Sequence, residues 1–455
     1  MMKSLFRWVL AAFLAVIAAG CTPSGEQQPE EVDPSTLEKF KLDVPVTQDW
    51  IFGPVPEIVV NIQNPNPVAV DALVEMRLNK DTKQLIERVQ KEVKVPANKT
   101  IDVVLSPSEP LSPGFYKASC YVNKKSARAF NFGVNPFEIV SAPDKQPDFD
   151  QFWATAFAQL PDLNVSKPVL TEVTKKSSST CKVYLVEFQS VPDGLEGEPV
   201  TVRGYYLEPQ DGKKHPVIMH FYGYDTLENP GTVSCPSGGS GTYAEFYLSH
   251  RGQYINRAPA SKREDGIDRD FSNTYGDWFA FNFGNRDGYY YRGAFMDCVQ
   301  AVHFMATRPT SDMGNLFAEG SSQGGALCYA VAALSDIPFT AIAPNVAFLG
   351  DFPDYFRIVD WPASVAKANR GSMTDDEMYA FLSYFDTKNL ATRINCAVWA
   401  TSGLQDATCP SHTNMAPFNN LPSKDKHMSF YPLMQHSYPS TWTSDIMKFF
   451  KDRIK

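Results

Sequence analysis

The chain has 455 residues, of which 43% are hydrophobic and 13% aromatic. This is more than one ordinary domain needs, so two folded domains are expected. The formal net charge is -9 at pH 7 and no basic run occurs, which argues against a nucleic acid as a partner, because phosphate binding needs concentrated Lys and Arg. An uncharged or weakly charged small substrate is expected instead.

The first 21 residues are typical of an export signal. Lys3 and Arg7 supply positive charge, and the apolar stretch 8–19 is too short to span a bilayer in the mature protein. Small residues then lead to Cys21, which resembles the lipobox of bacterial lipoproteins, where this cysteine is lipidated after cleavage. We expect a membrane partner through a lipid anchor at Cys21 and a location in the bacterial cell envelope. A soluble secreted form cut nearby is the alternative.

Residues 22–42 are rich in Pro, Glu, Gln and Ser, which predicts a flexible tether. From 43 to 140, short runs of alternating apolar and polar residues are broken by Pro, Asn and Gly. This pattern predicts a small all-β, immunoglobulin-like sandwich, although the Cys and Trp signature of true immunoglobulin domains is absent. A spacer or docking role is favoured for it over carbohydrate binding. The expected strands are 57–62, 68–78, 100–105, 115–122 and 127–134.

Segments typical of strands and helices alternate from 141 to 455, after a helical pattern over 149–160. Such alternation predicts an α/β fold, a mainly parallel sheet flanked by helices. The expected strands are 182–188, 200–207, 216–221, 244–248, 315–319, 340–344, 397–401 and 428–431.

The sharpest motif is Gly-Ser-Ser-Gln-Gly-Gly at 320–325, a G-x-S-x-G between the apolar strand 315–319 and the helical run 326–334. A tight turn from strand to helix leaves no room for side chains beside the serine, exposes its hydroxyl and places it at a helix N-terminus. This is the setting of the nucleophile of an α/β-hydrolase. Ser322 is therefore the predicted nucleophile.

A serine hydroxyl needs a histidine to take its proton, and in this fold the histidine follows the nucleophile and the acid along the chain. The candidates beyond Ser322 are His412, His427 and His436. His427 lies at the start of an expected strand and His412 in a loop flanked by proline. His436 lies between the last strand and the last helix, so it is the predicted base.

The acid that orients this histidine is predicted at Asp406. This residue comes just after the expected strand 397–401, where a carboxylate at the carboxyl end of a strand would reach the imidazole. A cap of a local turn is the structural alternative for Asp406. Asp425 is the second candidate for the acid.

The oxyanion of an acyl-transfer intermediate needs two donors. One is expected from the backbone N–H of Gln323, the residue after the nucleophile. The second is expected from Tyr224, because Gly223 follows the strand 216–221 and lets the backbone turn inward. Gly223 could equally be a simple turn glycine.

Residues from about 149 to the C-terminus resemble the acetyl xylan esterase and cephalosporin C deacetylase group, carbohydrate esterase family seven. The resemblance implies removal of small acyl groups, mainly acetyl, from sugar hydroxyls. A serine mechanism needs no cofactor, and the cysteine spacing predicts no metal site. The matching landmarks are Arg-Gly-Gln at 251–253, the 320–325 turn, Tyr-Tyr-Tyr-Arg-Gly at 289–293, Ala-Leu-Ser-Asp-Ile-Pro at 333–338 and Leu-Ser-Tyr-Phe-Asp at 382–386.

By motif, the family assigns the nucleophile, acid, base and both oxyanion donors to the five positions already named. It also implies that Arg251, Gly252 and Gln253 support the site; from chemistry alone, Arg251 would be an ordinary surface or ion-pairing residue. The chain departs from the family in having Ser437 after His436, where the family usually has Glu. This removes a neighbouring carboxylate without touching the proton relay.

The resulting hypothesis is a serine esterase that acts on an acetylated oligosaccharide, such as acetylated xylan, or another small ester, with a homo-oligomer as a possible assembly. The alternative within enzymes is an α/β-hydrolase for bulkier ester or peptide substrates, because pocket shape is not visible in the sequence. A different class is a polysaccharide-binding protein with a silent hydrolase domain, which the complete set of Ser, Asp and His disfavours.

Aromatic residues could stack on sugar rings near the site, but in a chain with 31 Phe and 20 Tyr they are more often core residues. The ones considered are Trp278, Phe279, Tyr289 and Trp361. The cysteines other than Cys21 number seven and lack disulfide or zinc spacing, so at least one free buried thiol is expected and no redox chemistry. Cys298 and Cys328, in expected helices, are interpreted as packing residues.

Overall fold

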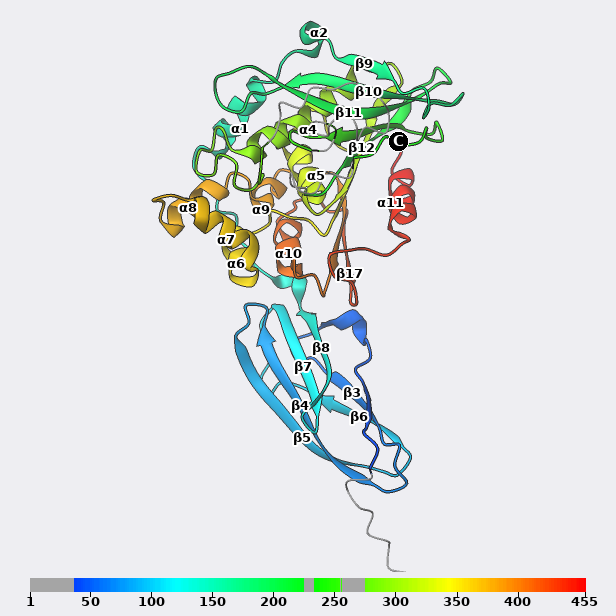
Figure 1. Cartoon of the computed structure of the whole chain (residues 1–455), viewed down its shortest axis with the longest axis vertical. Coiled ribbons are helices and arrows are strands. Elements are labelled where there is room, and N and C mark those ends of the chain that lie inside the picture. The colour runs from blue at the N-terminus through cyan, green and yellow to red at the C-terminus, as the bar shows by residue number, and fades with distance from the viewer. Residues whose placement is uncertain (1–36, 225–232, 254, 256–274) are drawn as a thin grey trace, which may run out of the picture.

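The computed structural model describes residues 37–224, 233–253, 255 and 275–455. Two bodies are stacked along the longest axis of the molecule, a β-sandwich and a larger α/β domain, and the coloured ribbon begins at the end of the sandwich remote from the α/β domain (Figure 1). The predicted export signal, Cys21 and most of the tether fall outside these residues. Within the described ranges, none of the helices combines the length and apolar character needed to cross a membrane.

The sandwich consists of two sheets. In the described residues, one has the strand order β1-β3-β6 and the other β2-β8-β7-β4-β5, with every pair antiparallel except the parallel pair β2 and β8. This is the two-sheet arrangement of an immunoglobulin-like domain. The strands are β1 (Lys41–Asp43), β2 (Ile51–Phe52), β3 (Ile58–Gln63), β4 (Val70–Lys80), β5 (Leu85–Val95), β6 (Thr100–Leu105), β7 (Gly114–Val122) and β8 (Lys125–Val134), with a 3-10 turn at Gln48–Trp50.

All five strands predicted between residues 43 and 140 are present, each shifted by at most two residues at either end. Strand β5 was missed. It lies at the edge of its sheet, seven of its eleven residues are exposed and five are charged, so it lacks the alternation of buried apolar residues that reveals β4.

The α/β domain is organised around a nine-stranded sheet in the described residues, of order β17-β16-β15-β14-β12-β13-β11-β10-β9. The strands from β17 to β13 in this order run parallel, whereas β11, β10 and β9 are antiparallel additions. The predicted mainly parallel sheet is thus confirmed. The strands are β9 (Val169–Glu172), β10 (Cys181–Ser190), β11 (Val200–Pro209), β12 (His215–Phe221), β13 (Ala244–Ser249), β14 (Ser311–Ser321), β15 (Ala341–Asn345), β16 (Ala397–Gly403) and β17 (Lys426–Tyr431).

Helices cover both faces of this sheet. Leu316 and Ala318 of β14 point into the core that contains the central helices, whereas Phe317 between them packs on Phe450 of the last helix at a ring distance of 4.8 Å. This alternation along one buried strand fixes a two-sided layer structure. The helices are α1 (Phe149–Ala158), α2 (Leu163–Ser166), α4 (Tyr290–Ala306), α5 (Gln323–Leu334), α6 (Phe352–Ile358), α7 (Asp360–Asn369), α8 (Asp375–Leu382), α9 (Thr387–Ala391), α10 (Ser411–Asn419) and α11 (Trp442–Lys451).

The two bodies meet through aromatic side chains. Phe115 of β7 lies 6.2 Å from Phe430 of β17, ring to ring. Phe137, in a 3-10 turn at Pro136–Glu138 that follows β8, lies 6.1 Å from both Phe418 and Phe430. The hydrophobic core therefore continues from the sandwich into the α/β domain.

A charged cluster lies between the central strands of the sheet. His220 of β12 bonds Glu319 of β14 through Nδ1 at 2.7 Å and Glu245 of β13 through Nε2 at 3.0 Å, and its ring stacks on Tyr247 at 4.0 Å. Burial alone would lower the pKa of His220, but the bonds to the two glutamates outweigh it and raise this pKa to about 9. A protonated His220 thus ties together the three strands that lead to the candidate site.

His220→Gln tests this cluster through the pH dependence of stability. Because the folded-state pKa of His220 is raised, its contribution is fully present below about 6.5 and is lost as pH rises through about 9. We expect the gap in free energy of unfolding between the parent and His220→Gln to shrink by up to about 3 kcal/mol over this range. Denaturant unfolding at a series of pH values measures it. His427→Gln, at an exposed side chain, is the control, and a gap that stays constant with pH would contradict the assignment.

Candidate active site

Ser322 occupies a strained turn between β14 and α5. Its backbone angles are φ 60° and ψ -120°, a combination that residues other than glycine rarely adopt. The surrounding backbone holds it there: the Ser322 N–H donates to Asn345 O at 2.9 Å, and the Phe348 N–H donates to Ser322 O at 3.0 Å. The predicted strand-turn-helix is present.

The glycines of the motif are required by close backbone contacts. A Cβ on Gly320 would lie 2.6 Å from the carbonyl oxygen of Gly324, and a Cβ on Gly324 would lie 2.2 Å from the carbonyl oxygen of Phe221. Real Cβ atoms do not approach other atoms so closely. The end of β12, which leads to the predicted oxyanion loop, thus packs directly on the turn that carries Ser322.

Asp406 and His436 are brought together beyond the carboxyl ends of β16 and β17. His436 Nδ1 donates to Asp406 Oδ2 at 2.7 Å, while Asp406 Oδ1 accepts the backbone N–H groups of Thr408 and Cys409 at 2.8 and 2.9 Å. The carboxylate is fully buried, whereas His436 is 30% exposed. Because Nδ1 carries the proton, Nε2 is the acceptor nitrogen of this imidazole.

The loop of Asp406 also reaches the turn that carries Ser322. Burial raises the pKa of the Cys409 thiol well above its usual value, and the side chain of Ser322 is close enough to lower this pKa in part. The backbone N–H of Cys409 is in turn bonded to Asp406. Through Cys409, Ser322 is thus linked to the loop of Asp406, and the carboxylate of Asp406 in turn bonds His436.

The side chain of Gln323, the first residue of α5, is held by a chain of buried hydrogen bonds. Its Oε1 accepts from Tyr291 Oη at 2.8 Å, and its Nε2 donates to Nε2 of His250 at 2.8 Å. Tyr290 Oη donates to Arg251 O and accepts from His250 Nδ1, both at 2.8 Å. His250 is thereby fixed in its neutral Nδ1–H form. This histidine was not identified from the sequence, although it directly precedes the Arg-Gly-Gln motif.

The loop of Tyr224 lies against the same turn. A Cβ on Gly223 would stand 3.9 Å from the Cβ of Ser322, and the Gly223 carbonyl accepts from Gln253 Nε2 at 3.2 Å. Tyr224 Oη donates to Asp277 at 2.6 Å. The backbone at Gly223 and Tyr224 is thus anchored on both sides beside Ser322.

Arg251 is completely buried, so it is not a surface residue. It is an ion-pairing residue, which was the other interpretation from its chemistry. It bonds both carboxylate oxygens of Asp297, at 2.6 and 2.9 Å, and Asp193 at 2.6 Å. Gly252, at φ 76°, turns the chain after it. Gly293 of the Tyr-Tyr-Tyr-Arg-Gly motif leaves the space that the guanidinium fills, since a Cβ there would lie 2.1 Å from Arg251 Nη1.

A family model described as acetyl xylan esterase (AXE1) matches residues 138–453, which is well over half of the chain and begins just after the sandwich strands. The chain belongs to the acetyl xylan esterase family. It is therefore a carboxylic ester hydrolase, and the predicted family is confirmed.

Individual relatives agree with this membership. Acetyl esterase Axe7A of Xylanibacter ruminicola is 26% identical over 350 residues, which cover 75% of each chain. Among solved structures, acetyl xylan esterase 1 from Thermoanaerobacterium sp. JW/SL YS485 and the acetyl xylan esterase from Paenibacillus sp. R4 both have a TM-score of 0.57, with 22% and 23% identity. Each covers 70% of this chain and 98% of its own, which confirms the α/β-hydrolase fold.

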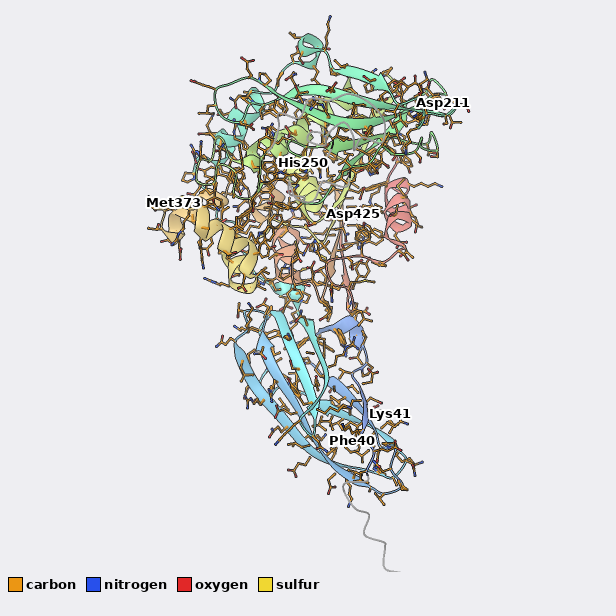
Figure 2. All side chains as sticks on the ribbon, in the orientation of Figure 1. Phe40, Lys41, Asp211, His250, Met373 and Asp425 are labelled. Atoms are coloured by element: carbon orange, nitrogen blue, oxygen red, sulfur yellow. The ribbon has the colours of Figure 1, made fainter. Side chains whose placement is uncertain are left out.

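The other acids and bases considered for this esterase lie elsewhere. Asp425 precedes β17, at the amino end of the strand, and bonds Arg453; Figure 2 shows it near helix α11. His427 lies in the same strand and is 67% exposed on its side chain. His412, in α10, faces Asp351 and Asp354.

Most of the aromatic residues that were considered for sugar stacking belong to the hydrophobic core, as the abundance of Phe and Tyr in the sequence favours. Trp278, Phe279 and Tyr289 are at most 1% exposed, so the hypothesis that these rings stack on a sugar is wrong. Trp361 is half-buried and packs edge-on against Tyr224 at 5.6 Å. The seven cysteines of the described residues form no disulfide with one another, and Cys298 and Cys328 are fully buried packing residues.

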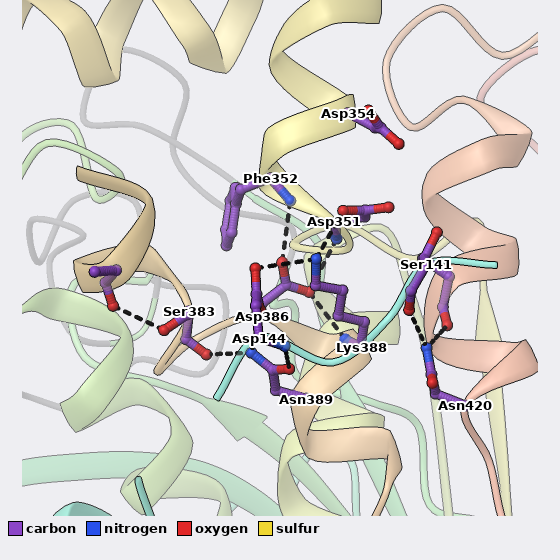
Figure 3. Close-up of polar contacts among 12 residues, drawn as sticks. Ser141, Asp144, Asp351, Phe352, Asp354, Ser383, Asp386, Lys388, Asn389 and Asn420 are labelled. Atoms are coloured by element: carbon purple, nitrogen blue, oxygen red, sulfur yellow. Dashed lines mark hydrogen bonds and ion pairs between the residues drawn. The ribbon is translucent and has the colours of Figure 1, made fainter. Parts of the chain in front are cut away.

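One group in the described residues has the composition of a metal site. Ligand atoms of Asp351, Asp354 and His412 lie within 4.8 Å of one another. Figure 3 shows Lys388 reaching Asp351, a contact of 2.9 Å. Burial lowers the pKa of His412, but bonds to Asp351 and Asp354 raise it to about 10, so imidazolium and ammonium groups already balance these carboxylates. We assign no metal to the group.

Gly324→Ala tests the close packing of the turn that carries Ser322. Because the new Cβ would lie 2.2 Å from the Phe221 carbonyl oxygen, the turn or β12 must shift, and we expect esterase activity to fall by about 100-fold or more. Hydrolysis of an aryl acetate and thermal unfolding measure the effect. Gly53→Ala, where a Cβ would meet nothing within 4 Å, is the matched control. Parental activity and melting temperature in Gly324→Ala would contradict this account.

Proposed function

We propose that this esterase removes acetyl groups from sugar hydroxyls of xylan-type substrates, with Ser322 as nucleophile, His436 as base and Asp406 as acid. The observation that carries this assignment is the bond of 2.7 Å between His436 and the buried Asp406 carboxylate, in the loop whose Cys409 contacts Ser322. The acetyl preference is supported by the relatives, which are named acetyl esterase and acetyl xylan esterase.

The reaction would proceed in two acyl transfers. Ser322 Oγ attacks the ester carbonyl carbon while His436 Nε2 takes the hydroxyl proton, and Asp406 stabilises the imidazolium through Nδ1–H. Collapse of the tetrahedral intermediate breaks the bond to the sugar oxygen, which leaves with that proton. Water, deprotonated by the same nitrogen, then attacks the acetyl-enzyme, and acetate and the free serine hydroxyl are formed.

Two backbone N–H groups are proposed as donors to the oxyanion, those of Gln323 and Tyr224. Gln323 begins α5, so its N–H belongs to the unpaired amino end of that helix, which also favours negative charge. The Tyr224 loop is anchored by Gln253 and Asp277. In this scheme Arg251, Gly252 and Gln253 support the oxyanion loop and do not transfer protons.

Ser322→Ala tests the assignment. We expect a folded protein whose release of acetate from acetylated xylo-oligosaccharides and from an aryl acetate falls at least about 10³-fold, because the covalent step is lost. Circular dichroism and melting temperature confirm folding. Substantial residual turnover would refute Ser322 as nucleophile. If the parent protein were active on the aryl acetate alone, or hydrolysed butyrate and acetate esters at equal rates, we would infer a bulkier ester as the natural substrate.

We further propose that the protein is a lipoprotein of the bacterial cell envelope, anchored through Cys21. The described chain enters at the end of the sandwich remote from the esterase domain (Figure 1), which would hold the site away from the membrane. The homo-oligomer that the resemblance implies stays a prediction.

Cys21→Ala tests the anchor. In bacterial cells, the parent is expected in the membrane fraction and labelled by a radioactive or clickable palmitate, whereas Cys21→Ala is expected in the soluble fraction and unlabelled, because acylation needs the thiol. Cys120→Ala, at a buried thiol of the sandwich, is the control. Equal fractionation and labelling of parent and Cys21→Ala would exclude this anchor.

A further inference from the structure

Gln405, the residue before the proposed acid, binds the loop of the proposed base. Its backbone N–H donates to Met434 O at 2.9 Å, and its side-chain Nε2 donates to Pro432 O at 2.8 Å. Both acceptors lie in the loop between β17 and α11 that carries His436. Gln405 therefore fixes the distance between the two loops from which Asp406 and His436 meet.

The same side chain reaches the sandwich. Gln405 Oε1 accepts the backbone N–H of Asn131 in β8 at 2.8 Å, and Gln405 Nε2 donates to the carbonyl of Asn131 at 3.0 Å. In an antiparallel pair, the N–H and C=O of one residue point to the same side. The N–H and C=O of Asn131 thus point away from Lys117, its partner in β7. They face the opposite side of β8, where the short strand β2 pairs only with Gly133 and Val134.

The carboxamide of Gln405 consequently takes the place of a neighbouring strand at the edge of β8. It presents one donor and one acceptor to one residue, as a peptide group of an added strand would. Gln405 is half-buried and Asn131 is half-buried, so both hydrogen bonds are partly shielded from water. This makes the contact more directional than an exposed polar contact.

Other segments of the sandwich enclose the same loop. Phe115 of β7 packs on Phe430 near the end of β17, and Asp81, in the turn after β4, lies 3.8 Å from His412 in α10. A cavity of about 210 Å³ opens between the two domains at this point. Its lining includes Tyr116, Lys117 and Asn131 from the sandwich and Leu404, Asp406 and Ala407 from the esterase domain.

We propose that Gln405 is a positioning residue, through which the edge of the sandwich holds the acid and base loops in register. The sandwich would then belong to the catalytic scaffold in addition to being a spacer. This inference rests on the proposed roles of Asp406 and His436. A displaced acid or base lowers the rate of acyl transfer while the surfaces that bind the ester stay in place.

The test compares Gln405→Ala and Gln405→Met with Asn419→Ala. Methionine keeps most of the length of glutamine without its hydrogen bonds. Asn419 is the matched control, because its Nδ2 also bridges the two bodies, to Pro136 O and Ile139 O at 3.1 and 2.9 Å, without bonding either loop. The readouts are kcat and KM for an aryl acetate, active sites counted with a fluorophosphonate, and melting temperature.

Both Gln405 variants are expected to lose kcat per titrated site by about 10-fold to 100-fold, with KM changed less than about 2-fold. Asn419→Ala is expected to keep kcat per titrated site even if its melting temperature falls. A purely structural role of Gln405 would lower melting temperature and the fraction of active sites at constant kcat per site, and would overturn the proposal. So would parental kcat in Gln405→Met.

Asn131→Pro approaches the same contact from the sandwich. It removes the N–H that faces Gln405 and no hydrogen bond to β7, and proline is tolerated at such an edge position. We expect a loss of kcat in the same direction; parental kcat in this variant would show that Gln405 acts without the sandwich. Failure of the proposed function is separately visible, because Ser322→Ala would then retain activity in the same assay.

Discussion

The backbone of Ser322 is held in a conformation that costs about 1–3 kcal/mol for a residue other than glycine, and the rest of the site is arranged around it. The turn is possible only because Gly320 and Gly324 let β12 approach to van der Waals contact. This approach brings the end of β12, and with it the loop of Tyr224, beside the serine hydroxyl. One steric constraint thus places the proposed nucleophile, the helix end and the proposed oxyanion loop together.

Buried charged residues also stabilise this arrangement. Arg251 and Asp297 are both fully buried, and a buried ion pair of this kind is a weak source of stability but a strongly directional one. Its orientation sets the path of the chain through Gly252 to Gln253, which holds the Gly223 carbonyl. His220 and its two glutamates act in a similar way within the sheet, where they join the strands that lead to the site.

The features that the sequence revealed are those written in local patterns. Alternating strands and helices indicated the parallel sheet, and the glycines around Ser322 indicated the turn. The contact between Asp406 and His436 followed from their order along the chain. What could not be predicted depends on residues far apart: His250 contacts Gln323 across 73 positions and Asn131 contacts Gln405 across 274. Such pairs leave no periodicity in the sequence, because only the folded backbone brings them within reach.

The aromatic contacts between the sandwich and the esterase domain limit where the chain can be cut into separate domains. Composition suggests a cut after residue 140, since strand β8 ends at Val134 and helix α1 begins at Phe149. Yet the excised esterase fragment would expose Phe418 and Phe430 to water, and Gln405 would lose its hydrogen bond with Asn131 of β8. Uncovered rings of this kind favour self-association. Recombinant forms and chimaeras of this esterase are therefore better built with the sandwich retained.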